Sequence, residues 1–419
     1  MTLLVLKHLS SEDERSPEFR FLLSVTLART REVFDTSEVR TWRDVGGVGA
    51  PDAETTDARA LDAVSDRHDA VLVLGRENLW FTADTLRDMR TALANDAGAI
   101  VIPSRLTDFA LDDLEPLYTP RDYERLERSI RDERRQPRTS TVSHLPMSLL
   151  SADAFRTIAS RVPISRLLTD AALLSTPRHD AGLRIITDVG LYHQFADYYG
   201  ETRADLLPYL PATAEAVLEI GCGRGHTGRL IQERLGCRVT GIERHPEVAA
   251  EAATRLWRVL AGDVATLPID GRYDAIVASE LFEHLDAPDD FLLRMKPLLA
   301  PGGRIVLSVP NVGHYTIVED LLAGRWDYVP AGLLCYTHLR FFTRQTLEEW
   351  AFRLGFTCEI VPQLTELPER FRRLADSLSG NLSGSLSSSV DVESLRTRGF
   401  YVVLRDAHST AASSSGSTR

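Results

Sequence analysis

The chain has 419 residues, of which 43% are hydrophobic and 26% are charged, and its formal net charge is −12. This length exceeds what one hydrophobic core usually supports, so we expect two domains. The negative charge argues against a general nucleic-acid binder, which needs clustered Lys and Arg to neutralise phosphates. The 4 cysteines lack Cys-x-x-Cys spacing, and no apolar run approaches the ~18 residues of a membrane span. We therefore expect a cytoplasmic protein with reduced thiols and no membrane segment.

The first half of the chain alternates predicted strands with predicted helices. Strand, helix and strand at this spacing indicate a βαβ unit and a parallel sheet. We therefore predict an α/β accessory domain over residues 1–187. The apolar patterns place strands at 3–6, 69–75 and 99–103, and helices at 17–34 and 82–93.

Residues 69–103 resemble part of the nucleotide-sugar-binding core of GT-A type glycosyltransferases: a strand, an acidic turn, Phe-Thr-x-Asp-Thr-Leu, a helix and a further strand. Those enzymes usually hold a divalent metal between the two carboxylates of an Asp-x-Asp pair. Here the turn carries Arg76 and Glu77, so it offers one acid instead of two. We therefore expect a degenerate domain that helps to bind an acceptor or a partner, and the alternative is a domain that still transfers a sugar. The densely charged residues 112–141 predict an exposed helical excursion or a mobile lid.

The stretch 216–225, Ala-Val-Leu-Glu-Ile-Gly-Cys-Gly-Arg-Gly, predicts a buried strand that turns sharply into a helix over 226–235. Glycines in such a turn adopt positive φ and let the backbone approach a ligand closely. The spacing differs from the Gly-x-Gly-x-x-Gly of a dinucleotide loop, because His226 occupies the sixth position. Glu219 would also repel a phosphate, so the turn suits a ligand with a cationic end.

Further motifs follow the glycine turn along the chain. The next strand ends at Glu243, twenty residues after Gly223, where a carboxylate can hold both ribose hydroxyls of a nucleoside. The others are Gly262-Asp263-Val264, the strand 273–278, the phrase Ser279-Glu-Leu-Phe-Glu-His-Leu285 and the Pro-Gly-Gly-containing run 296–307. Together these motifs resemble those of the class I methyltransferases that use S-adenosylmethionine.

The resemblance implies a fold and a domain plan. The fold is a Rossmann-like, seven-stranded α/β domain over residues 211–405, with a mostly parallel sheet and an antiparallel last strand. Residues 188–210, which we predict as two helical pieces broken at Gly200, become a linker and cofactor lid. Residues 406–419 are polar and Ser-rich, which predicts a disordered tail.

The resemblance also assigns S-adenosylmethionine as the cofactor and names its contacts. Glu243 would hold the ribose and Asp263 would lie against the adenine. Glu219 alternatively caps the amides of the loop, and Glu280 alternatively caps the start of a helix. The implied cofactor-binding residues are Glu219, Gly221, Cys222, Gly223, Gly225, Glu243, Asp263, Val264, Ser279 and Glu280.

Methyl transfer from a sulfonium is an in-line displacement that depends mainly on positioning, so we expect no metal. An alcohol acceptor also needs a base, for which histidine is the usual choice. The candidates are His284, His314 and His338, each of which alternatively packs or anchors a loop. The expected acceptor contacts are Asn311, Tyr315, Arg340 and Tyr199.

The segments 309–315, 317–328 and 336–343 resemble those of methyltransferases from bacterial polysaccharide and natural-product pathways. We therefore expect O-methylation of a sugar or a glycosylated small molecule, with that acceptor as the partner. The alternatives are a bifunctional glycosyltransferase-methyltransferase and a non-catalytic scaffold that binds S-adenosylmethionine.

Overall fold

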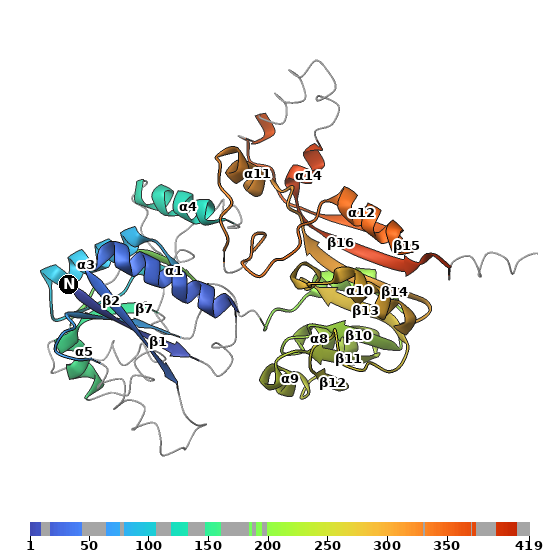
Figure 1. The fold of residues 1–419 in the computed structure, drawn as a ribbon, viewed down its shortest axis with the longest axis horizontal. Helices are drawn as coiled ribbons and strands as arrows, with labels where there is room; N and C mark the ends of the chain where they lie inside the picture. Colours follow the sequence, from blue (N-terminus) through green and yellow to red (C-terminus); the bar gives the residue numbers. More distant parts are fainter. Residues whose placement is uncertain are drawn as a thin grey trace, which may run out of the picture. The chain divides into compact units, whose positions relative to one another are not determined.

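The structure is a computed structural model, and the chain divides in it into two compact units, Met1–Ala196 and Asp197–Arg419 (Figure 1). The described residues are 1–9, 17–43, 64–75, 79–105, 119–132, 147–160, 184–186, 190–194, 199–329, 332–369, 371–373 and 391–408.

The N-terminal unit has the strands β1 (Thr2–Leu9), β2 (Thr36–Arg43), β3 (Ala70–Leu74), β4 (Leu79–Phe81), β5 (Ala99–Val101), β6 (Ser104–Arg105), β7 (Met147–Ser151), β8 (Arg184–Ile186) and β9 (Leu191–Gln194). Its helices are α1 (Pro17–Val33), α3 (Ala83–Asn95), α4 (Pro120–Asp132) and α5 (Ala152–Ala159). One sheet has the strand order β2-β1-β3-β7-β5-β8, and a smaller one has the order β4-β9-β6. In the larger sheet β7 runs antiparallel to β3 and β5, whereas the other pairs are parallel.

Helices lie on both faces of the six-stranded sheet, as Figure 1 shows for α5 on one face and α1 and α3 on the other. Leu4 of β1 belongs to a buried cluster with Phe155 of α5. Its neighbour Leu3 belongs to the opposite cluster, with Leu86 and Met89 of α3. Successive residues of β1 therefore face opposite cores, as expected for a strand that is buried on both sides.

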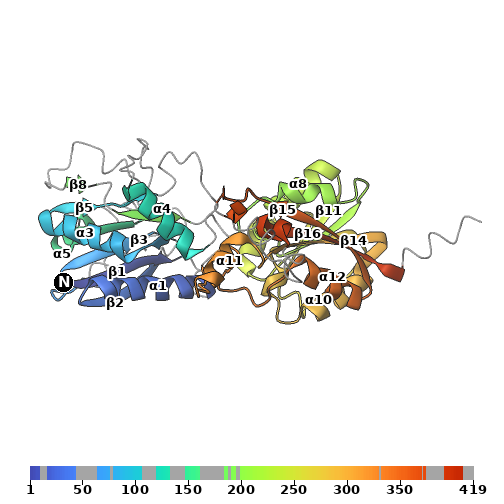
Figure 2. The same ribbon diagram turned by 90° about the horizontal axis from the view of Figure 1, so that it is seen from above.

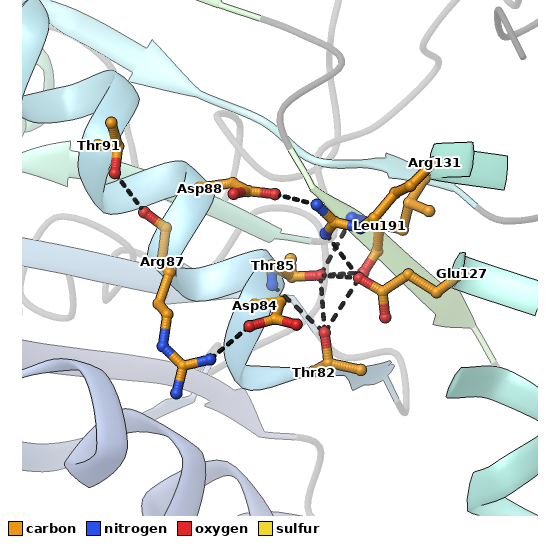
Figure 3. A network of polar contacts seen from close by, with 9 residues as sticks. All are labelled: Thr82, Asp84, Thr85, Arg87, Asp88, Thr91, Glu127, Arg131 and Leu191. Atoms are coloured by element: carbon orange, nitrogen blue, oxygen red, sulfur yellow. Dashed lines mark hydrogen bonds and ion pairs between the residues drawn. The ribbon is translucent and has the colours of Figure 1, made fainter. Parts of the chain in front are cut away.

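A buried polar network joins α4 to α3 and β9 (Figure 3). The Glu127 carboxylate accepts a hydrogen bond from Thr82 Oγ1 at 3.1 Å, and Thr85 Oγ1 lies 3.3 Å from it. Arg131 donates to the same carboxylate at 2.7 Å. Thr85 Oγ1 also lies 2.8 Å from the carbonyl oxygen of Leu191. Helix α4 belongs to the charged stretch that we predict as an excursion or lid, and this network anchors its inner face.

One predicted element is wrong. Residues 191–194, which we expected to be helical, form β9, and Tyr192 pairs there with Phe81 of β4. Leu191 and Tyr192 are buried. In so short a segment, pairing with a neighbouring strand and burial outweigh an apolar spacing that also fits a helix.

Some expectations fall on residues outside the described ranges. They include Arg76 and Glu77 of the glycosyltransferase comparison, part of the stretch 112–141, and residues 409–419 of the predicted tail. Within the described part of the chain, no helix combines the length and the apolar character that crossing a membrane requires.

The C-terminal unit has the strands β10 (Ala216–Ile220), β11 (Arg238–Glu243), β12 (Arg258–Ala261), β13 (Tyr273–Ser279), β14 (Leu299–Pro310), β15 (Phe356–Leu364) and β16 (Thr397–Asp406). Its helices are α8 (His226–Leu235), α9 (Pro246–Ala252), α10 (Pro288–Met295), α11 (Tyr315–Leu322), α12 (Arg344–Arg353) and α14 (Val392–Arg396), with short 3-10 turns η3 (Ala204–Tyr209), η4 (Phe282–His284) and η5 (Lys296–Leu298).

These strands form one seven-stranded sheet in the order β12-β11-β10-β13-β14-β16-β15. The five strands from β12 to β14 pair in parallel, and β16 is antiparallel to both β14 and β15. The predicted Rossmann-like α/β fold with a mostly parallel sheet is therefore confirmed for this unit. Helix α8 has the predicted bounds, because Gly225 before it and Gly236 after it both adopt the left-handed conformation.

Helices cover both faces of this sheet, and Figure 2 shows α8 on one side and α10 and α12 on the other. On the α8 side, Val217 and Val239 pack with Ile231. On the other side, Leu218 packs in a cluster with Leu292 of α10. Strand β10 is therefore apolar at consecutive positions, as a strand covered on both faces must be. Both faces of the sheet are occupied, so a ligand can approach only at the ends of the strands.

Gly241 lies in the middle of β11, packed against Cys222 of the glycine turn and Leu256 of the segment after α9. A Cβ at this position would lie 2.6 Å from Cys222 Sγ and 2.7 Å from Leu256 Cδ1. We expect Gly241→Ala to lower the free energy of unfolding of the C-terminal unit by about 1–3 kcal/mol, because the core must shift to admit the methyl group. Denaturant unfolding followed by tryptophan fluorescence measures this. Arg234→Ala, at an exposed position of α8, is the control, and equal stability of the two variants would contradict the packing argument.

Candidate functional site

The glycine turn lies at the carboxyl end of β10. Gly221, Gly223 and Gly225 have φ values of 71°, 51° and 80°, which lie in the region that favours glycine. A Cβ at Gly223 would lie 2.6 Å from the carbonyl oxygen of Tyr199. Gly225 is the N-cap of α8 and offers no side chain to the first N–H groups of the helix. The N–H groups of the turn donate within the protein, those of Gly221 and Cys222 to the carbonyl oxygen of Ile242 and that of Gly223 to Glu243. The turn therefore has a fixed shape in which its glycines carry no side chain at the end of the sheet.

Glu243 ends the neighbouring strand β11 and braces this turn. Its Oε2 accepts a hydrogen bond from Gly223 N at 3.1 Å, and its Oε1 accepts one from His245 N at 2.9 Å. The side chain is only 5% exposed. Two backbone donors therefore fix a carboxylate beside the glycine turn.

Asp263 and Val264 follow β12, the strand beyond β11. Asp263 Oδ1 accepts from Ala265 N at 2.9 Å, and Gly262 N donates to the carbonyl oxygen of Glu243 at 2.9 Å. Asp263 is exposed and Val264 is partly buried. The structure therefore brings the predicted ribose and adenine contacts to adjacent strand ends.

Glu219 and Cys222 are also predicted cofactor residues, and their side chains are buried. A Cβ at Gly228 of α8 would overlap Glu219 Oε2, which has no hydrogen-bond partner among the described residues. Burial raises the pKa of Glu219 to about 8. Burial likewise raises the pKa of the Cys222 thiol, whose sulfur packs beside Gly241. Glu219 thus lies beneath α8, and Cys222 contributes its backbone to the turn.

Ser279 and Glu280, at the end of β13, belong to a polar network. Arg203 donates to Ser279 Oγ at 2.7 Å, and Ser279 Oγ lies 3.0 Å from Ser308 Oγ of β14. Ser308 Oγ donates to Glu280 Oε1 at 2.7 Å. Glu280 has a φ of 47°, and among the described residues it is the one non-glycine with a positive φ. The network joins the ends of β13 and β14 to the segment before η3.

Two of the predicted histidines come together with Glu283. One potential ligand atom from each of Glu283, His284 and His338 lies within 4.8 Å of the other two. Glu283 Oε1 is 3.8 Å from His338 Nε2, and the two imidazole rings meet edge to face with centroids 4.8 Å apart. Burial, reinforced by the charge of Glu280, raises the pKa of Glu283 well above its usual range. Burial, with His284 nearby, lowers the pKa of His338 to about 3.

His314, the third candidate base, is fully buried at the start of α11. Its Nδ1 lies 3.0 Å from Thr316 Oγ1 and its Nε2 lies 3.1 Å from Thr365 Oγ1. Burial lowers its pKa to about 3. Both ring nitrogens are engaged inside the protein, so the structure places His314 as a helix cap and not beside His284 and His338.

Asn311 and Tyr315, which are predicted acceptor contacts, are also buried. Asn311 Nδ2 donates to the carbonyl oxygens of Ser394 at 2.9 Å and Thr397 at 2.8 Å. Asn311 Oδ1 accepts from Gly313 N at 2.9 Å. These hydrogen bonds anchor the loop after β14 to the segment 394–397.

Several accessible residues of the predicted acceptor region lie after α11. Arg340 is exposed and donates through Nη2 to the carbonyl oxygen of Asp286 at 2.7 Å. Trp326, Tyr328 and Tyr336 are 36%, 40% and 46% exposed. Tyr199, near the glycine turn, is partly buried. Of the four predicted acceptor contacts, Arg340 and Tyr199 therefore remain reachable.

Sequence reasoning missed the role of Ser308 and the joint arrangement around Glu283. Ser308 lies opposite Ser279 in the β13 and β14 pairing, and a buried serine in an apolar strand was the available signal. His338 belongs to a different loop from Glu283 and His284, so no local spacing links them.

Comparison with known proteins agrees with this geometry. Residues 191–360 match the family described as "Methyltransferase domain". The C-terminal unit therefore contains a class I S-adenosylmethionine-dependent methyltransferase domain.

Two curated relatives and one solved structure illustrate the similarity. Trans-aconitate 2-methyltransferase of Streptomyces avermitilis is 31% identical over 155 residues, which cover 33% of this chain and 58% of that protein. The mitochondrial ubiquinone biosynthesis O-methyltransferase of Schizosaccharomyces pombe is 32% identical over 121 residues, covering 26% and 41%. A methyltransferase structure from Archaeoglobus fulgidus has a TM-score of 0.36 and 20% identity, covering 48% and 91%. The chain thus spans about half the length of the curated relatives that it matches.

Glu219 makes stability depend on pH. Its folded-state pKa of about 8 exceeds the ordinary value of 4.5, so between these values the folded chain keeps a proton that the unfolded chain has lost. Rising pH therefore destabilises the folded protein through this residue, by at most about 1.4 kcal/mol per pH unit. Glu219→Gln cannot ionise and should gain stability relative to the wild type as the pH rises from about 5 to 8.

Denaturant unfolding at several pH values, without cofactor, measures this difference. Glu233→Gln is the control, because Glu233 is exposed on α8. Parallel stability curves for Glu219→Gln and the wild type would show that Glu219 is ionised in the folded protein.

Proposed function

We propose that this protein transfers a methyl group from S-adenosylmethionine to an oxygen atom of a small molecule. The observation that carries the proposal is the Glu243 carboxylate, held by Gly223 N and His245 N at the edge of the glycine turn. When bound, the cofactor supplies an electrophilic methyl group on a sulfonium.

The residues at the strand ends fit this cofactor. The positive φ values of Gly221, Gly223 and Gly225 give a turn to which a ligand can come close, because no Cβ is in the way. A carboxylate at the end of the second strand suits a pair of ribose hydroxyls, and Glu243 occupies that place. Exposed Asp263, on the next strand end, is reachable by the adenine.

The chain's own contribution is mainly to position the two reactants. Well-oriented groups in a fixed geometry are worth about 7–11 kcal/mol of the barrier. At the end of β13, Arg203 donates to Ser279 and forms an ion pair with Glu280, and Glu280 N donates to Ser308 Oγ, so this strand end is held rigidly. We propose that Ser279 and Glu280 lie against the methionine portion of the cofactor.

The acceptor class is the finer part of the proposal. One relative's name specifies O-methylation, which supports an oxygen acceptor. The exposed rings of Trp326, Tyr328 and Tyr336 offer flat apolar faces that pack against the C–H faces of a sugar ring, and Arg340 offers a cation nearby. We propose a sugar hydroxyl, free or on a glycosylated small molecule, as the first acceptor to test. The N-terminal unit is then proposed as an accessory domain for acceptor or partner binding.

Cofactor binding is the first test. Calorimetric titration of the full chain should show micromolar binding of S-adenosylmethionine and none of NAD. Glu243→Ala should weaken the binding at least ~10-fold, or about 1.4 kcal/mol, because it removes both the ribose partner and the brace on Gly223. The exposed control Glu233→Gln should bind like the wild type. Binding that is indifferent to Glu243 would overturn the assignment of the site.

Turnover is the second test. Formation of S-adenosylhomocysteine is measured with three acceptor panels: sugars and nucleotide sugars, phenols, and carboxylic acids. We expect acceptor-dependent product with the sugar panel, lost in Glu243→Ala. Product only with phenols or carboxylic acids would contradict the sugar acceptor but would still support methyltransferase activity. Tight cofactor binding without turnover of any panel would favour the non-catalytic scaffold.

A further inference from the structure

The group formed by Glu283, His284 and His338 is not accounted for by cofactor binding. The potential ligand atoms of these three residues lie within 4.8 Å of one another. The carboxylate and His338 are buried, and His284 is partly buried. Metal–ligand bonds of about 2.0–2.2 Å put neighbouring ligand atoms roughly 3–4 Å apart. The 3.8 Å between Glu283 Oε1 and His338 Nε2 already has this spacing, and donors within 4.8 Å of one another need only a small inward movement to share one ion.

Glu283 is the most informative member. Its side chain has no exposed surface, and neither of its carboxylate oxygens has a hydrogen-bond partner among the described residues. The 3.8 Å separation of Glu283 Oε1 from His338 Nε2 is too long for a hydrogen bond. A buried carboxylate that lacks partners is strongly unfavourable. A bound cation would supply what these oxygens lack.

The two histidines are oriented as metal ligands are. His338 Nδ1 lies 3.0 Å from the carbonyl oxygen of Leu333, and His284 Nδ1 lies 3.1 Å from that of Thr337. A carbonyl oxygen only accepts, so each Nδ1 carries the proton and each Nε2 carries the lone pair. A ligating histidine typically donates its other ring N–H to a backbone carbonyl in this way.

The backbone fixes the arrangement before any ion binds. The carbonyl oxygen of Glu283 accepts hydrogen bonds from Leu339 N at 2.8 Å and Arg340 N at 3.1 Å. The loop after β13 and the loop that carries His338 are therefore joined directly at the cluster. Preorganised donors of this kind bind an ion without first having to order two loops.

We propose that Glu283, His284 and His338 bind a divalent transition-metal cation at the carboxyl end of β13. Two imidazole nitrogens and one carboxylate form a donor set that suits Zn²⁺ and its first-row neighbours, whereas Mg²⁺ and Ca²⁺ prefer oxygen ligands. Three protein ligands leave at least one coordination position open for another oxygen. This differs from our expectation that the chemistry involves no metal.

The position of the site indicates what that oxygen is, and this step rests on the proposed function. Strand β13 pairs directly with β10, so its end lies beside the glycine turn at the same edge of the sheet. An acceptor hydroxyl bound to the cation has a lowered pKa and releases its proton to solvent. Its oxygen lone pair then forms the bond to the methyl carbon, while the electron pair of the carbon–sulfur bond goes to sulfur and leaves S-adenosylhomocysteine.

Metal binding itself is tested without cofactor or acceptor. The full chain, free of any affinity tag, is stripped with a chelator and titrated with Co²⁺, followed by its visible absorption, and with Zn²⁺ in a calorimeter. We expect one ion per chain, with Mg²⁺ unable to compete. Glu283→Gln and His338→Gln should each bind at least ~100-fold more weakly, whereas His408→Ala, which removes an exposed histidine, should bind like the wild type.

The outcomes separate this proposal from the proposed function. No binding by the wild-type chain, or undiminished binding by variants that are shown to be folded by circular dichroism, would overturn the metal site. The wild-type titration tests the metal site by itself, so the proposal can be rejected even if a variant fails to fold. Calorimetry with S-adenosylmethionine on the stripped protein reports the cofactor site separately. Metal binding without cofactor binding would support the metal site and contradict the proposed methyltransferase function.

Discussion

The two hydrogen bonds that the Glu243 carboxylate accepts hold together the part of the C-terminal unit on which its chemistry depends. One comes from Gly223 in the turn after β10, and the other from His245 in the loop after β11. Parallel pairing brings these two loops to the same edge of the sheet. Glycine loses more conformational entropy on ordering than any other residue, so a turn with three glycines needs such a brace to keep one shape.

Three buried carboxylates in this unit show how differently the fold treats the same group. Glu243 is satisfied by backbone donors, and its position is fixed by them. Glu219, under α8, has one oxygen with no partner among the residues that the structure describes, and its raised pKa keeps it neutral. Glu283 has no hydrogen-bond partner for either oxygen in the described part of the chain, but it lies beside two imidazoles. A buried acid therefore marks a ligand site only where other donors converge on it.

The sequence predicted the features that depend on local pattern. The turn at Gly221, Gly223 and Gly225 and the helix after it follow from residues that are adjacent in the chain, and the two ends of α8 follow from glycine geometry. Strand β9 was missed because its pairing with β4 is a tertiary contact that no spacing within 191–194 reveals. For the same reason the proximity of Glu283 and His338, and the burial of His314 under Thr365, required the structure.

The backbone of Glu280 has a left-handed φ of 47°. For a residue with a side chain this conformation costs about 1–2 kcal/mol relative to the ordinary helical one, whereas glycine would adopt it freely. The chain nevertheless places a carboxylate here, next to Ser308 and 3.6 Å from Arg203. A glycine would give a more relaxed turn but would carry no negative charge. The strain at Glu280 therefore lowers the stability of the folded protein slightly, and it places an acid at a fixed position at this strand end.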